Sequence, residues 1–158
     1  MKRLSKVVAL ILIVGCVSVS ASGQSAPASS RSGVTDLFAG IKATIEKNLG
    51  RPYVWGADGL KSFDCSGFAW RVMAENGILL KRTTARKFYM ILKPAVKEEQ
   101  GNFGTLVFFD DLKHMGIINS PTTFYHAQSV VGTNLSPLNP YWKKLVYGYR
   151  QLPLPDSK

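Results

Sequence analysis

Residues 63–77 read FDCSGFAWRVMAENG and include the cysteine on which the predicted fold depends. A helical pattern runs from about Cys65 to Asn76, and Gly77 supplies a C-terminal stop. Cys65 therefore lies at a helix N-terminus, where the positive end of the helix dipole and unpaired amides favour thiolate over thiol. Because most free cysteines in proteins are small buried hydrophobic residues, Cys65 alone does not establish a nucleophile.

Two more helices are predicted around this segment. Apolar residues recur at helical spacing within residues 34–49, and Gly50 follows as a stop. A third helix begins with Thr83 or Thr84 as its cap and ends before Pro94, which cannot continue it. The helical part of the chain is therefore expected to end there.

Beyond Gly104 the sequence changes to short β-branched and aromatic runs separated by turn residues. These runs are the predicted strands, at residues 105–109, 114–118, 123–128 and 145–149. Helices first and strands afterwards predict an α+β domain, in which N-terminal helices pack on a C-terminal antiparallel sheet.

The chain has two histidines, and both lie in predicted strands. His114 opens one strand and His126 lies in the next, so a short hairpin would bring their rings together. A thiol mechanism needs a base and a polar group that holds the base, and His114 and His126 can fill these roles beside Cys65. Two alternatives stay open: both histidines are structural, or they bind zinc with Cys65. The spacings, 114 − 65 = 49 and 126 − 114 = 12, lack the close ligand pair usual in zinc sites.

Several segments resemble the NlpC-type cell-wall cysteine peptidases of the papain-like superfamily. The similarity begins in residues 51–68, which contain Pro-Tyr-Val-Trp-Gly and Phe-Asp-Cys-Ser-Gly-Phe. It continues in family order through Arg82-Thr83-Thr84, residues 104–109, His114-Met115-Gly116-Ile117 and Tyr125-His126-Ala127. The resemblance implies a papain-like fold with Cys65 as nucleophile, His114 as general base and His126 as the orienting third member.

Three further residues gain an expected role beside the nucleophile. The resemblance implies that Tyr53 lines the active site near the oxyanion and that Asp64 and Ser66 help to hold the substrate peptide. The small side chains of Ser66 and Gly67 are also expected to leave room beside the sulfur for a substrate.

The substrate that the resemblance implies is the stem peptide of peptidoglycan. Such enzymes typically cleave the bond between D-glutamate, through its γ-carboxyl, and a diamino acid, with no metal or cofactor. Departures from the family pattern at Ala57, Lys61, Lys87 and Thr105 leave the exact bond open. Two alternatives are a papain-like amidase or acyltransferase acting on another amide, and a catalytically silent protein that binds the wall.

The chain divides into four segments by composition. Residues 1–16 are expected to be a lipoprotein-type export signal, because a basic start is followed by an apolar run too short to span a membrane. This run ends in Ile-Val-Gly-Cys, which resembles the bacterial lipobox and makes Cys16 the expected lipidation site. Residues 17–33 are a Ser-rich tether, 34–152 the single domain and 153–158 a tail.

Location and partners follow from this leader and from charge. The protein is expected to be exported and lipid-anchored at the cell envelope, at the outer membrane or in the periplasm; the alternative is a secreted protein cleaved near Ala21. The 158 residues carry 20 Lys and Arg against 10 Asp and Glu, a net charge of +10. Outside the cytosol this charge suits wall carboxylates or lipid headgroups rather than nucleic acid, although a merely solvated basic surface is an alternative.

Overall fold

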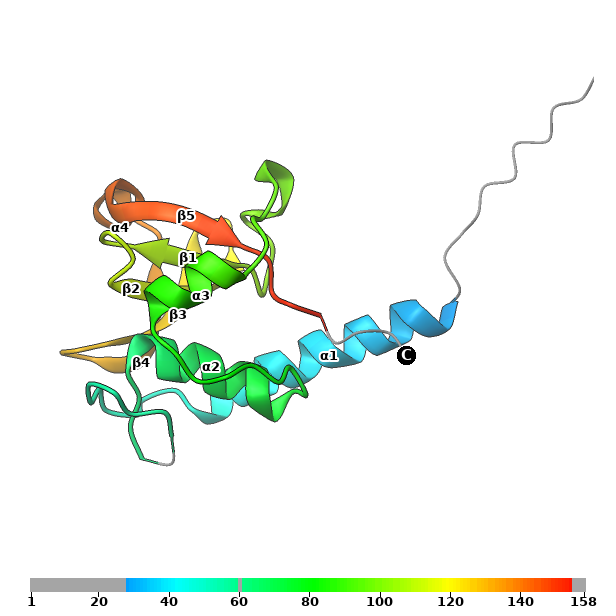
Figure 1. The fold of residues 1–158 in the computed structure, drawn as a ribbon, viewed down its shortest axis with the longest axis horizontal. Helices are drawn as coiled ribbons and strands as arrows, with labels where there is room; N and C mark the ends of the chain where they lie inside the picture. The colour runs from blue at the N-terminus through cyan, green and yellow to red at the C-terminus, as the bar shows by residue number, and fades with distance from the viewer. Residues whose placement is uncertain (1–27, 60, 155–158) are drawn as a thin grey trace, which may run out of the picture.

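Three helices precede a five-stranded sheet in the computed structural model, which describes residues 28–59 and 61–154 (Figure 1). The elements are α1 (Ala28–Lys47), α2 (Cys65–Glu75), α3 (Ala85–Ile91), the short 3-10 helix η1 (Lys97–Glu99), β1 (Leu106–Phe109), β2 (His114–Ser120), β3 (Thr123–Gln128), β4 (Gly132–Pro137), α4 (Pro140–Leu145) and β5 (Val146–Arg150). Within the described ranges, no helix has the length and apolar character needed to cross a membrane.

The sheet is antiparallel throughout, with strand order β4-β3-β2-β1-β5. The hairpin of β2 and β3 lies at its centre and pairs Ile117 with Tyr125. Helix α2 contacts both of these strands, and α1 packs on α2. The predicted α+β architecture, with helices before an antiparallel sheet, is therefore confirmed.

The two faces of the sheet contribute to separate apolar cores. On β2, Met115 and Ile117 join the large core formed with the helices, whereas Ile118 joins a smaller core on the other face. Because side chains alternate along a strand, His114 shares its face with Ile118. Helix α4 covers this face through Trp142, which packs against the smaller core. The smaller core is thus the one that surrounds the histidines.

The predicted starts of α2 and α3 are confirmed by their caps. Asp64 caps α2 by accepting from the amide of Gly67, and Thr84 caps α3 by accepting from the amide of Lys87. Of the two candidate threonines, Thr84 is therefore the one that caps α3. Gly77 follows α2 with φ of 79°, a left-handed conformation that glycine adopts at little cost.

The structure differs from the sequence prediction at the start of α1 and after β3. Helix α1 begins at Ala28, inside the range 17–33 that was expected to be a tether, because each residue added to an established helix gains one hydrogen bond. Residues 1–27, which include Cys16, lie outside the described residues. The strand β4 and the helix α4 were not predicted.

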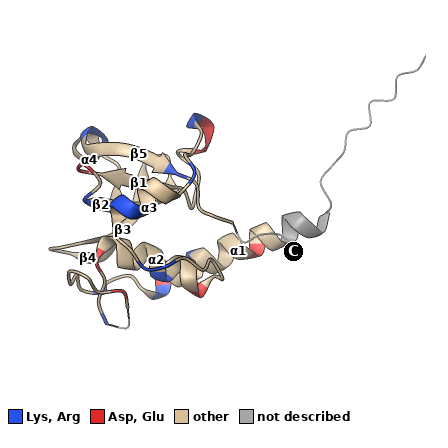
Figure 2. Cartoon of the chain, viewed as in Figure 1, with Lys and Arg blue, Asp and Glu red and all other residues tan. Residues whose placement is uncertain are grey.

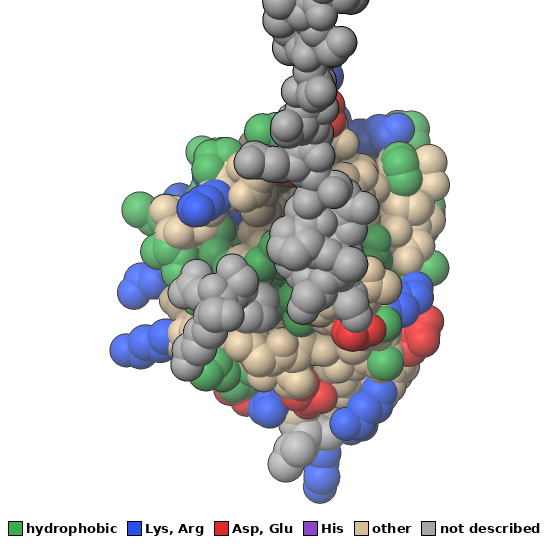
Figure 3. All heavy atoms as spheres, turned by 90° about the vertical axis from the view of Figure 1, so that its right-hand side faces the viewer, with side chains coloured by type: hydrophobic (Ala, Val, Ile, Leu, Met, Phe, Trp, Pro, Cys, Tyr) green, Lys and Arg blue, Asp and Glu red, His purple; other side chains and the backbone are tan. Residues whose placement is uncertain are grey.

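The charged residues of the described chain are scattered over several elements (Figure 2). Lys and Arg occur on α2, on α3 and close to α4, with Asp and Glu between them. In the view of Figure 3, basic side chains project at several points of the outline, and neither histidine is visible among the coloured residues. The basic side chains of the described residues are therefore not gathered on a single element.

Candidate active site

The thiol of Cys65 lies where the first turn of α2 meets the start of β2. Cys65 is the first residue of the helix and its side chain is 5% exposed. Its sulfur donates to the carbonyl of Lys113 at 3.9 Å and also faces the backbone amide of Met115. The thiol therefore contacts the backbone on both sides of His114, which brings nucleophile and predicted base into one site.

The carboxylate of Asp64 organises the segment around the nucleophile. It accepts from the amide of Gly67 and, at 3.0 Å, from the amide of Gly56. Nη2 of Arg82 donates to both carboxylate oxygens at 2.8 Å, and the hydroxyl of Ser66 donates to Oδ1 at 3.0 Å. Asp64 and Ser66 are both buried and engaged with protein groups. Their implied contact with a substrate peptide stays a prediction, and their visible role is to fix the start of α2.

The small residues Ser66 and Gly67 were expected to leave space beside the sulfur of Cys65, but at Gly67 this space is occupied. A Cβ atom added to Gly67 would lie 2.1 Å from the carbonyl oxygen of Ala57. Glycine is therefore required at this position because the backbone of residues 57–58 packs directly against α2. The expectation that Gly67 leaves room for a substrate was wrong.

The two histidine rings are hydrogen-bonded, as the hairpin arrangement predicted. Nε2 of His114 lies 2.7 Å from Nδ1 of His126, with the ring planes at 80°. His126 is fully buried, and its Nε2 lies 2.9 Å from the hydroxyl of Ser136 on β4. One ring therefore holds the other in place, which is the arrangement expected of a base and its orienting residue.

An aromatic enclosure formed by Phe109, Phe124 and Trp142 surrounds both histidines. The indole of Trp142 stacks on His114 with centroids 5.5 Å apart and meets His126 edge-on at 5.1 Å. Asn139 caps α4 by accepting from the amide of Trp142, which fixes the position of this side chain. Sequence reasoning missed Trp142, because only the packing of α4 on the sheet brings it to the histidines.

This enclosure sets the protonation state of the histidines. Burial lowers the pKa of His114 to about 4, against a smaller opposing effect of the Asp110 carboxylate. Burial, with a further contribution from His114, lowers the pKa of His126 to about 3. Both rings are therefore neutral at neutral pH, and a neutral His114 can accept a proton.

Burial also determines the direction in which the pKa of the Cys65 thiol is shifted. It raises the pKa of Cys65 to about 11, and the nearby Asp64 carboxylate acts in the same direction. Hydrogen bonds from the backbone amides of Met115, Ser66 and Cys65 itself oppose this rise without cancelling it. The amides at the helix N-terminus therefore favour the thiolate, as expected, but in the free protein desolvation outweighs them and the pKa is raised.

The raised pKa leads to a prediction for alkylation. Because the thiolate is the reactive species, Cys65 should react with iodoacetamide only slowly at neutral pH and faster as the pH rises beyond the ordinary thiol pKa of about 8.5. The rate of carbamidomethylation of the Cys65 peptide, followed by mass spectrometry over a pH series, measures this. A titration midpoint below that of free cysteine would show instead that His114 and Cys65 form an ion pair.

A cleft of about 420 Å³ opens beside His114, whereas Cys65 and His126 are not among the residues that line it. Its lining includes Tyr53, His114 and Trp142, together with the charged pair Asp110 and Lys113. Burial raises the pKa of Tyr53, and Cys65 and Asp64 contribute to the rise, so its phenol stays a hydrogen-bond donor. Tyr53 thus lines the same cleft as His114, and its role near the oxyanion stays a prediction.

The turn that joins β1 to β2 has an unusual backbone. Asp110, Asp111 and Leu112 have φ of 48°, 49° and 69°, a left-handed region that residues other than glycine rarely occupy. Arg86 on α3 donates to the carbonyl of Asp111 at 2.7 Å. This tight turn leads into Lys113, whose carbonyl accepts from the thiol, so contacts with α3 help to hold the residues next to the nucleophile.

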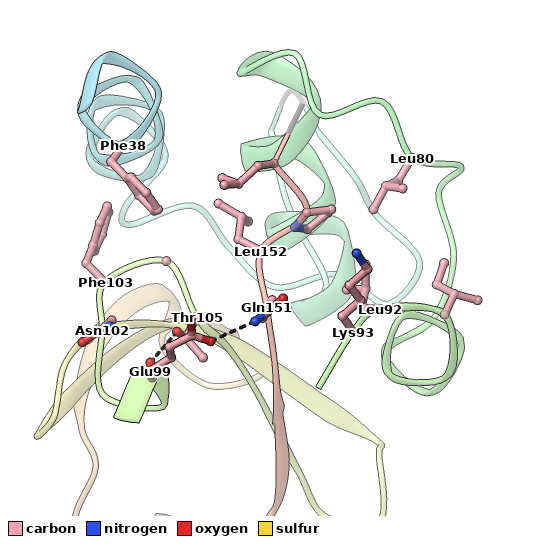
Figure 4. A pocket seen from close by; sticks show the side chains of 14 residues that line it. Phe38, Leu80, Leu92, Lys93, Glu99, Asn102, Phe103, Thr105, Gln151 and Leu152 are labelled. Carbon is pink, nitrogen blue, oxygen red and sulfur yellow. Dashed lines mark hydrogen bonds between the residues drawn. The ribbon is translucent and has the colours of Figure 1, made fainter. Parts of the chain in front are cut away.

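A second cavity, of about 640 Å³, lies near the C-terminal end of the described chain (Figure 4). Phe38, Phe103 and Leu152 form part of its apolar wall, and Gln151 donates to Glu99 at its polar side. None of the predicted site residues lines this cavity. In residues 28–59 and 61–154, no cluster of three or more His, Cys, Asp or Glu side chains is arranged to hold a metal ion.

The fold and the site define a papain-like α+β domain, in which a cysteine at a helix N-terminus packs against the backbone on both sides of a histidine in an antiparallel sheet. Residues 50–151 match the NlpC/P60 family, and the chain belongs to that family.

Two relatives show the extent of the sequence similarity. The probable peptidoglycan endopeptidase LytE of Bacillus subtilis is 34% identical over 123 residues, which cover 75% of this chain and 34% of LytE. The probable endopeptidase p60 of Listeria seeligeri is 42% identical over 80 residues, 49% of this chain and 15% of the relative. The chain thus matches only a minor part of the length of these proteins.

A solved structure shows the same fold. The crystal structure of a lipoprotein-like NLP/P60 family protein from Staphylococcus aureus superposes with a TM-score of 0.65 at 30% identity. The similarity covers 73% of this chain and 41% of the other. The predicted papain-like fold and NlpC-type family are both confirmed.

Proposed function

We propose that this protein is a cysteine peptidase that cleaves amide bonds in the stem peptides of peptidoglycan. The observation that carries the proposal is the contact of the Cys65 thiol with the backbone on both sides of His114, whose ring is hydrogen-bonded to His126. Relatives named as peptidoglycan endopeptidases support the substrate class.

The geometry supports a thiol mechanism that starts from neutral groups. His114 takes the proton of Cys65 as the sulfur attacks the carbonyl carbon of the scissile amide. The tetrahedral intermediate collapses when the imidazolium of His114 returns this proton to the leaving amine, and an acyl-enzyme thioester remains. Water then attacks the thioester with His114 again as base, which releases the carboxylic acid and the free thiol.

The cleft has a cationic side chain, Lys113, beside the carboxylate of Asp110. Lys113 lines the cleft, and its pairing with Asp110 is a solvent-exposed contact of 3.7 Å that a substrate carboxylate can displace. A γ-linked D-glutamate keeps its α-carboxylate free beside the scissile bond. We therefore take the bond between D-γ-glutamate and a diamino acid as the leading candidate.

Mass analysis of purified muropeptides incubated with the protein tests this proposal. The expected products are a fragment ending in D-glutamate and a fragment beginning with the diamino acid. Activity should survive chelation by EDTA and be lost on thiol alkylation, because the proposed mechanism uses a thiol and no metal. Loss in EDTA with recovery on added zinc would contradict the thiol mechanism, and acyl transfer to an added amine would identify an acyltransferase.

We also propose that the protein is lipid-anchored at the cell envelope through Cys16. The support is the sequence Ile13-Val14-Gly15-Cys16 at the end of an apolar run. A diacyl anchor holds a protein stably on a membrane where a single chain does not. The residues between Cys16 and the start of α1 would join the anchor to the domain.

Replacing Cys16 with serine is expected to release the protein from membranes or to stall its maturation, because serine cannot carry the thioether-linked lipid. Membrane fractionation in the native host and mass measurement of the N-terminal peptide check this result. A soluble wild-type protein with an unmodified start near Ser22 would show simple secretion instead.

A further inference from the structure

A chain of hydrogen bonds runs from the predicted catalytic pair to β4, the strand that the sequence did not predict. His126 on β3 lies opposite Asn134 in the ladder, and Ser136 lies on the same face two residues further along β4. His126 and Ser136 are both buried. The bonds of this chain have defined directions, and those directions determine which nitrogen of each ring carries hydrogen.

The donor-to-acceptor direction of these hydrogen bonds is set at Asn134. Its side-chain nitrogen donates to the carbonyl of Gly132 at 2.8 Å, and a carbonyl oxygen can only accept. The side-chain oxygen of Asn134 therefore faces Ser136, whose hydroxyl donates to it at 2.7 Å. Since a hydroxyl has one hydrogen, Ser136 has none left to give to a second neighbour.

This assignment propagates through both rings. With its hydrogen used, Ser136 must accept from Nε2–H of His126 at 2.9 Å. A neutral imidazole has one N–H, so Nδ1 of His126 is an acceptor and takes the hydrogen from Nε2 of His114 at 2.7 Å. His114 then carries its lone pair on Nδ1, the nitrogen that is not bonded to His126.

We infer that Asn134 and Ser136 are positioning residues that fix the tautomers of both histidines and keep Nδ1 of His114 ready to accept the thiol proton. The opposite tautomers would place a hydrogen on Nδ1 of His114, and that ring could no longer act as base toward Cys65. The inference rests on the proposed function only for its consequence in catalysis, because the tautomers themselves follow from the hydrogen bonds.

Long-range nitrogen–proton NMR spectra of the isotope-labelled protein at neutral pH test the assignment directly. The chain has two histidines, so the spectra hold two ring systems, and both rings are neutral at that pH. We expect both to be protonated on Nε2. A His114 ring protonated on Nδ1 in the wild-type protein would overturn the inference without any variant.

Variants of β4 test whether Asn134 and Ser136 fix these tautomers. In Asn134→Ala the Ser136 hydroxyl loses its acceptor and turns its hydrogen to Nε2 of His126, so both rings should change to the Nδ1–H tautomer. We expect kcat to fall roughly tenfold, the equivalent of one hydrogen bond, with little change in KM. Asn134→Asp keeps an acceptor for Ser136 and should keep the wild-type tautomers, as should Ser136→Thr.

The matched control is Leu135→Ala, because Leu135 lies between the two positioning residues, points to the other side of β4 and is 46% exposed. It should leave both tautomers and kcat unchanged. Unchanged ring spectra and kcat in folded Asn134→Ala would overturn the inference. Tautomers that change as expected in a protein that cleaves no wall peptide would support it and count against the proposed function.

Discussion

Replacing Cys65 with alanine is expected to lower the rate of muropeptide cleavage by roughly 10⁴-fold or more, to the background rate, because no other group can form the acyl-enzyme. Folding should survive. The side chain lost is small and buried in the large core, and the caps of α2 are untouched, so the free energy of unfolding should fall by only about 1 kcal/mol. Product formation measured by mass spectrometry, beside a urea unfolding curve, separates the two quantities.

Two companion variants make this result specific. His114→Ala should also lose cleavage, because the thiol of Cys65 has a raised pKa and needs a base to lose its proton. His126→Ala should keep part of the activity if its role is to orient His114. Cleavage at the wild-type rate by folded Cys65→Ala would contradict the proposed mechanism, whatever the other variants do.

The second large effect is expected at Arg82. In Arg82→Leu the Asp64 carboxylate, whose side chain is 9% exposed, loses the guanidinium that donates to both of its oxygens. Removing one partner of such a pair leaves a buried charge uncompensated, and we expect the free energy of unfolding to fall by about 3 kcal/mol. Urea denaturation followed by circular dichroism measures the loss.

A double variant and an exposed pair provide the controls. Asn is as good a helix cap as Asp and carries no charge, so Asp64→Asn combined with Arg82→Leu should recover most of the loss. The exposed pair Lys47 and Glu75 should contribute little, and Lys47→Leu is expected to change stability by less than about 0.5 kcal/mol. A similar loss in the single and double variants would show that Arg82 acts through packing and not through the charge of Asp64.

The sequence predicted those parts of the site that depend on local signals. A helix start is marked by its cap and a strand by alternation, so Cys65 on α2 and the two histidines on neighbouring strands could be placed from residue patterns alone. The hairpin between the histidines is short, which predicted that their rings lie close together. The predicted cap at Thr83 or Thr84 rests on the same local chemistry, whereas the cap at Asp64 was not predicted.

What the sequence could not predict depends on contacts between distant segments. Strand β4 has the sequence GTNLSP, in which turn-forming residues outweigh β-branched ones, and it becomes a strand because β3 offers a free edge. Trp142 reaches the histidines only through the packing of α4. The sequence predicted that the helix end lowers the pKa of Cys65. It could not predict the larger rise caused by burial, because burial is a property of the assembled fold and is not visible in a local pattern.

The nucleophile and the base come from different halves of the domain, and this separation links catalysis to folding. His114 and His126 belong to one hairpin, which closes over a short stretch of chain and can form from local contacts. Cys65 precedes His114 by 114 − 65 = 49 residues and meets β2 only when α2 docks on the sheet. An unfolded or half-folded chain therefore carries a thiol and two imidazoles that do not act together. The proposed peptidase activity therefore requires completed tertiary structure, and a chain that has not yet folded is not expected to attack the amides around it.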